Sequence, residues 1–80
     1  MDITKFKQLF NQGFDLEFNI GDIFYSVTSK DIEHSKIAYL GNEKKESLKF
    51  DSIDVLLKHK INNQTLEEII KKTPDKEIYY

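Results

Sequence analysis

Residues 14–28 read Phe-Asp-Leu-Glu-Phe-Asn-Ile-Gly-Asp-Ile-Phe-Tyr-Ser-Val-Thr, and this stretch decides the fold. Apolar and polar residues alternate on both sides of Gly21-Asp22, which is the pattern of two antiparallel strands joined by a tight turn. Glycine at the first central position suits a two-residue type II′ turn, because that position needs a positive φ. The turn fixes a register that pairs Leu16 with Val27, Glu17 with Ser26, Phe18 with Tyr25, Asn19 with Phe24 and Ile20 with Ile23.

This register gives the hairpin one apolar face and one polar face. The apolar face carries Leu16, Phe18, Ile20, Ile23, Tyr25 and Val27. Phe24 is an exception, because it lies among the polar residues of the other face. An isolated two-stranded hairpin is marginally stable in water, so the rest of the chain is expected to cover the apolar face.

The segments before and after the hairpin predict that cover. Residues 2–12 have helical spacing of apolar residues, with Asp2 as the N-cap and Gly13 ending the helix in a left-handed conformation. Ser29–Ser35 is a polar connection. Residues 36–40 and 46–50 then predict two strands joined by the charged loop 41–45.

The second half of the chain predicts two more helices. Asp51 is expected to cap a helix that runs to Ile61, where Asn62-Asn63 ends it. Thr65 and Glu68 form a capping-box pattern for a short helix that stops at Thr73-Pro74. The alternation in the strand 36–40 allows either face to be buried. We expect Ile37 and Tyr39 to face inward, which would leave Leu40 on the outer face.

The resulting element order is αββββαα. It predicts an α+β fold, with a four-stranded antiparallel meander and three short helices packed on one face. Residues 1–74 are expected to form a single compact domain. Residues 75–80 are a tail that either docks on the domain, on the uncovered face or as an edge strand, or frays.

Composition excludes several classes of function. The 80 residues include no cysteine, which excludes disulfides, thiolate metal sites and cysteine nucleophiles. All twelve basic residues are lysine, and the absence of arginine argues against nucleic-acid binding. No long apolar run predicts a membrane helix, and the absence of an export signal favours the cytoplasm.

The chain offers little of the chemistry that enzymes or cofactors need. No base is predicted beside a nucleophile, no phosphate-binding loop is present, and a domain of this size leaves little room for a pocket. We therefore expect no catalysis and no cofactor. Two weaker alternatives are a small-molecule or metal site on the Asp15/Glu17 strand face or in the Asp31–His34 loop.

Apolar residues left over from the core suggest a protein-interaction surface. The candidates are Phe24, Leu40, Ile78, Tyr79 and Tyr80. The main hypothesis is thus a small non-catalytic module that binds an unknown protein partner, either as a monomer or as a homodimer. A homodimer would use the aromatic tail as its interface.

Residues 15–72 resemble small uncharacterised proteins of low-GC Gram-positive bacteria and their phages. The shared features are an acidic strand with a glycine turn, Tyr25-Ser26, the Phe-Asp-Ser-Ile segment at residues 50–53, and the Ile-x-x-x-Thr-Leu segment at residues 61–66. The resemblance implies a phage or mobile-element origin. It implies no activity and no functional residue.

Overall fold

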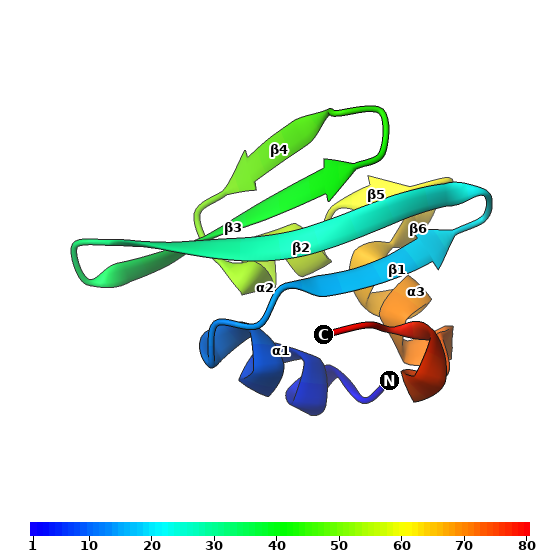
Figure 1. Cartoon of the computed structure of the whole chain (residues 1–80), viewed down its shortest axis with the longest axis horizontal. Coiled ribbons are helices and arrows are strands. Elements are labelled where there is room, and N and C mark those ends of the chain that lie inside the picture. Colours follow the sequence, from blue (N-terminus) through cyan, green and yellow to red (C-terminus); the bar gives the residue numbers. More distant parts are fainter.

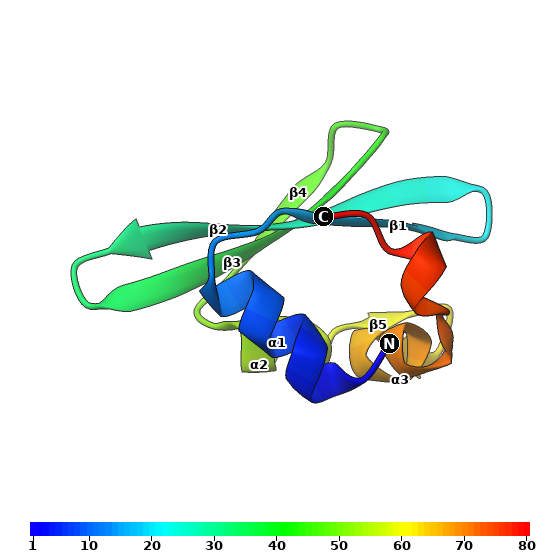
Figure 2. The same cartoon turned by 60° about the horizontal axis from the view of Figure 1, so that its bottom comes forward.

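The computed structural model describes all 80 residues as a four-stranded antiparallel sheet with its helices on one face (Figures 1 and 2). The strands lie in the sheet in chain order, from β1 to β4, and a two-stranded hairpin of β5 and β6 stands apart. This confirms the predicted α+β class and the meander. The elements are α1 (Ile3–Asn11), β1 (Leu16–Ile20), β2 (Ile23–Ile32), β3 (Ser35–Asn42), β4 (Ser47–Phe50), α2 (Ile53–Leu57), β5 (Lys60–Ile61), β6 (Gln64–Thr65), α3 (Leu66–Lys72) and the 3₁₀ helix η1 (Asp75–Glu77).

The hairpin of β1 and β2 has the register that the alternation predicts, from Leu16 opposite Val27 to Ile20 opposite Ile23. Gly21 has a φ of 61°, and Asp22 is not among the residues with a positive φ. This combination is the type II′ pattern, in which only the first central residue needs the left-handed region.

The core lies between the apolar face of this hairpin and the three helices. Its fully buried side chains are Phe6, Phe10, Leu16, Phe18, Val27, Leu56, Leu57, Leu66 and Ile70. The rings of Phe6 on α1 and Phe18 on β1 meet edge to face at 6.3 Å. Each element therefore buries its apolar stripe against the same sheet face, as a two-layer fold requires.

The end of α1 turns the chain into β1 through a Schellman motif. The amide of Gly13 donates to the carbonyl of Phe10, and the amide of Phe14 donates to the carbonyl of Leu9. Gly13 has a φ of 92°, as predicted for the residue after the C-cap. At the other end Asp2 occupies the N-cap position, but its side chain makes no capping hydrogen bond.

The predicted polar connection at Ser29–Ser35 is wrong, because β2 and β3 continue through it as one long hairpin. Asp31 pairs with Lys36 and Ile32 with Ser35, leaving a two-residue turn at Glu33-His34. Lys36 Nζ lies 3.0 Å from Asp31 Oδ1, and this cross-strand ion pair accompanies backbone pairing beyond the apolar core.

The predicted orientation of the third strand is also wrong. Val27 faces the core and lies opposite Leu40, so Leu40 and Ala38 share the buried face. Leu40 is only 4% exposed and cannot belong to an outer surface. Tyr39 lies on the opposite face with Thr28, because side chains alternate along the strand.

The second helix is shorter than predicted. Ser52, rather than Asp51, caps it by accepting a hydrogen bond from the Val55 amide at 3.3 Å, and α2 ends at Leu57. The chain then forms the β5–β6 hairpin across Asn62 and Asn63, whose φ values are 53° and 66°. Two consecutive positive φ values define a type I′ turn, which asparagine tolerates.

The last helix and the tail close the domain. Thr65 and Glu68 form the predicted capping box of α3, with both reciprocal hydrogen bonds in place. After η1, Ile78 is buried in the core, and Tyr79 pairs with Glu17 as an antiparallel bridge. The tail is therefore docked, and it lies along the outer edge of β1 (Figure 1).

Candidate functional site

The structure divides the five predicted interaction residues into three groups. Leu40 and Ile78 lie in the hydrophobic core and are each only 4% exposed, so neither belongs to an exposed outer surface. Phe24 is half-buried on the outer sheet face, where its carbonyl accepts a hydrogen bond from the Glu43 amide. Tyr79 and Tyr80 are 56% and 54% exposed.

Three exposed aromatic residues lie where the tail meets the start of β1, and we name this set, Phe14, Tyr79 and Tyr80, the aromatic patch. The rings of Phe14 and Tyr80 meet edge to face at 6.0 Å, and Phe14 is 42% exposed. The Schellman motif positions Phe14. The backbone bridge to Glu17, with two hydrogen bonds of 2.8 Å, positions Tyr79 and thereby Tyr80.

The tail is also fixed by charge. Lys5 Nζ on α1 donates to Asp75 Oδ2 on η1 at 2.8 Å. This hydrogen bond raises the pKa of Lys5 and lowers the pKa of Asp75, since it favours the charged form of each. The ion pair holds Asp75, at the start of the tail, against α1.

The structure does not arrange either alternative site, the Asp15/Glu17 strand face or the Asp31–His34 loop, for binding a ligand. Asp31 is paired with Lys36, and Glu33 and His34 form the exposed turn of the β2–β3 hairpin. On β1, the backbone of Glu17 is bonded to the tail, and Asp15 is exposed just before the strand. No group of three or more histidine, aspartate or glutamate side chains in the chain is arranged to hold a metal ion.

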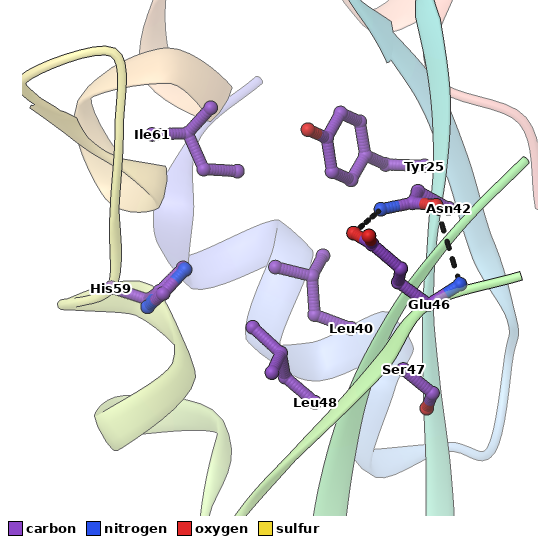
Figure 3. Close-up of a pocket in the computed structure, with 8 residues that line it drawn as sticks. All are labelled: Tyr25, Leu40, Asn42, Glu46, Ser47, Leu48, His59 and Ile61. Carbon is purple, nitrogen blue, oxygen red and sulfur yellow. Dashed lines mark hydrogen bonds between the residues drawn. The ribbon is translucent and has the colours of Figure 1, made fainter. Parts of the chain in front are cut away.

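The structure contains a groove that the sequence did not predict. It has a volume of about 460 Å³ and lies between the β3–β4 end of the sheet and the segment that leads into β5 (Figure 3). We name it the β4 groove. Its lining residues are Tyr25, Leu40, Asn42, Glu46, Ser47, Leu48, His59 and Ile61. The expectation of little room for a pocket is therefore wrong, because two hairpins diverge here.

Polar groups surround the apolar floor of the β4 groove. Glu46 directs its carboxylate into the groove and accepts a hydrogen bond from Asn42 Nδ2 at 3.2 Å (Figure 3). Asn42 Oδ1 accepts from the amides of Lys44 and Glu46, which fixes the turn before β4. Glu46 forms no ion pair, so its charge is free to meet a cation.

His59 forms the opposite wall of the groove. Its amide donates to the carbonyl of Leu56 at 3.0 Å, and its own carbonyl accepts from the Leu66 amide at 2.8 Å. Its ring packs edge to face on Phe50 at 5.4 Å. His59 therefore lies half-buried beyond the end of α2 at Leu57, whereas the sequence predicted a helix that runs to Ile61.

The groove combines apolar area with a few fixed polar groups, which is the usual composition of a binding site. Tyr25, Glu46 and His59 make no hydrogen bonds with one another. Sequence reasoning missed this set because its members lie on different elements. The one available signal was Asn62-Asn63, a pair that suits a type I′ hairpin turn better than a helix end.

Comparison with known proteins adds no family. No protein-family model, no curated protein and no solved structure matches this chain. None of its helices has the length and apolar character needed to cross a membrane. The functional argument therefore depends on the surface of the molecule itself.

Proposed function

We propose that this chain is a small non-catalytic protein-interaction module that works in the cytoplasm and binds its partner through the aromatic patch. The observation that supports it most is the exposure of three large aromatic side chains at one end of the fold. Neighbouring Ile78 is buried and holds the tail in place, so the tail does not need Tyr80 to dock.

Tyrosine is well suited to such a surface. Its ring contributes large apolar area, its hydroxyl can bond to a partner, and it has few rotatable bonds to order on binding. Tyrosine is also enriched among the residues that dominate binding energy at protein interfaces. Single exposed apolar residues are normal, but the contact between Phe14 and Tyr80 joins two of the three side chains into one surface.

Charge supports a protein partner over a nucleic acid. The chain has a net charge of −2 and no arginine, whereas proteins that bind phosphate backbones usually present a basic face. Phe24 is a weaker part of the surface, because it is half-buried and its backbone is tied to Glu43.

The test is affinity capture from a lysate of the native host with the full chain and with a Tyr79→Ser/Tyr80→Ser double variant. Side-chain substitution is preferable to truncation, because removing Ile78 would open the core. We expect the wild-type chain to capture a specific protein and the double variant to lose it.

A matched control is Val55→Ser, which removes an exposed apolar side chain on α2 outside the aromatic patch. Circular dichroism and urea denaturation would establish that all variants are folded. Equal capture by the wild-type chain and the double variant would contradict the proposed surface, as would the absence of any captured protein.

A further inference from the structure

The sheet has two edges, and only one of them is covered. The tail pairs with β1 at Glu17, whereas nothing pairs with the outer side of β4. The Asn42 amide donates to the Glu46 carbonyl, so this pair has its backbone groups directed at each other. Hydrogen-bonded pairs alternate along antiparallel strands, and therefore the backbone groups of Ser47 and Lys49 point to the free edge.

The β4 groove lies beside this free edge. Glu46 and Leu48 occupy the same sheet face because they are two residues apart, and both line the groove. Leu48 is 47% exposed although it lies on the core-facing side of the sheet. The buried side chain of Leu40 lies directly opposite it on β3 and extends the apolar floor.

We propose that the free edge of β4 and the β4 groove together bind an extended peptide segment by strand addition. The segment carries an apolar side chain and, two residues along, a lysine or arginine. The apolar side chain packs over Leu48 towards Ile61, and the cation meets the carboxylate of Glu46. Side chains alternate between the two faces of a strand, so the peptide residues opposite Leu48 and Glu46 are two positions apart. Side chains directly opposite on adjacent strands lie about 4.5–5.5 Å apart, within contact distance.

Charge and hydrogen bonding select this occupant. Glu46 is the one carboxylate in the lining, and Asn42 holds it without neutralising it. Strand addition uses main-chain hydrogen bonds for affinity and alternate side-chain pockets for specificity, and this surface offers both. The chain already uses the same mode within itself, because Tyr79 bridges β1 while Ile78 enters the core.

A second copy of the chain fits the edge less well. Antiparallel pairing of two β4 strands about Leu48 would place Glu46 opposite Phe50. The carboxylate would then meet an aromatic ring instead of a cation. A small molecule in the groove would leave the amides and carbonyls of Ser47 and Lys49 unused.

The test is selection of short random peptides, displayed on phage, against the immobilised full-length chain. We expect enriched peptides with lysine or arginine two positions from an apolar residue, after it if the peptide pairs antiparallel to β4 and before it if the pairing is parallel. Glu46→Lys should weaken binding of a selected basic peptide about tenfold and shift the selected residue to aspartate or glutamate. Glu77→Lys adds the same charge outside the groove and should leave both affinity and preference unchanged.

Backbone N-methylation of the selected peptide separates strand addition from side-chain binding. We expect N-methylation at alternate positions to weaken binding about tenfold, because it removes amide donors to the β4 edge. Failure to enrich peptides, enrichment without a basic residue, or indifference to N-methylation at every position would overturn the proposal. So would a wild-type dimer in light scattering that Leu48→Lys converts to a monomer.

This proposal is independent of the aromatic patch, which lies at the β1 edge of the sheet. The Tyr79→Ser/Tyr80→Ser variant should therefore retain peptide binding. Loss of lysate capture in that variant with no peptide selected would refute the groove and leave the aromatic patch standing. Selection of a basic peptide, together with unchanged lysate capture by that variant, would support the groove and refute the aromatic patch.

Discussion

Single residues in the turns of this protein hold backbone conformations that most side chains avoid. Lys45 has a φ of 65° and ends the turn before β4, where glycine would be expected. Left-handed backbone costs a residue with a Cβ about 1–2 kcal/mol, whereas glycine adopts it freely. Glycine loses part of this gain through the greater entropy of its unfolded chain. Lys45→Gly should therefore raise the free energy of unfolding by about 0.5–1 kcal/mol.

Urea denaturation at neutral pH measures this effect. Lys44→Gly is the matched control, because Lys44 lies in the same turn but has no positive φ. It should give no gain, since glycine there only adds entropy to the unfolded state. An equal gain in both variants would show that the effect comes from charge or from loop flexibility instead of from φ.

At the scale of one element, α3 depends on its capping box. The Thr65 hydroxyl accepts a hydrogen bond from the Glu68 amide at 3.2 Å, which satisfies one of the free amides of the first turn. Thr65→Ala should lower the free energy of unfolding by about 1 kcal/mol. Thr65→Ser keeps the capping hydroxyl and should therefore lower it much less. Urea denaturation checks both. A serine variant as unstable as the alanine variant would show that threonine acts through its methyl group.

The same capping box predicts how acid affects α3. The Thr65 amide donates to Glu68 Oε1 at 3.1 Å, and this bond lowers the pKa of Glu68 below its ordinary value of 4.5. A lowered pKa gives stability that is fully present above 4.5 and is lost as the pH falls through the folded value. Glu68→Gln should therefore show a smaller loss of stability than wild type below pH 4.5. The measurement is the urea midpoint as a function of pH.

Glu67→Gln serves as the control for that pH profile. Glu67 lies in the same helical turn, and it contacts Lys71 at 3.5 Å instead of the helix N-terminus. Its substitution should leave the acid slope close to that of wild type. A profile in Glu68→Gln that matches wild type would show that the capping carboxylate is not coupled to folding.

An element could be predicted from the sequence when the residues that determine it are adjacent in the chain. The β1–β2 register, the Schellman turn at Gly13 and the Thr65–Glu68 box are each set by a few adjacent residues, and all three were predicted. The long β2–β3 hairpin was missed, because polar residues 29–35 show no alternation and pair only through their partner strand. Strand β3 is apolar on both faces, so the burial of Leu40 depends on pairing with Val27.

At the scale of the whole molecule, the features that bear on function are the least local. The β4 groove exists because the β3–β4 end of the sheet and the β5 segment diverge, and its lining joins residues from Tyr25 to Ile61. The docking of the tail on β1 joins residues at opposite ends of the chain. No periodicity within one segment carries this information. The resulting molecule has one sheet edge that its own tail pairs with at Glu17 and one edge with no paired strand.

The edge that the tail pairs with gives a prediction about local stability. The Glu17 amide donates to the Tyr79 carbonyl, and the Tyr79 amide donates back to Glu17, both at 2.8 Å. Asn19 occupies the same side of β1 beyond the tail, so its amide points outward without a partner on that edge. Amide hydrogen exchange should therefore be at least about tenfold slower at Glu17 than at Asn19 in the wild-type chain.

Tyr79→Pro tests whether the tail causes this protection. Proline removes the donor at residue 79, while Ile78 already has the extended conformation that a following proline requires, with a φ of −109° and a ψ of 120°. Exchange at Glu17 should then rise towards that of Asn19. Tyr80→Pro is the matched control, since the Tyr80 amide forms no backbone bond to β1. Slow exchange at Glu17 in both variants would mean that β1 is protected by the sheet alone and that the tail does not close this edge.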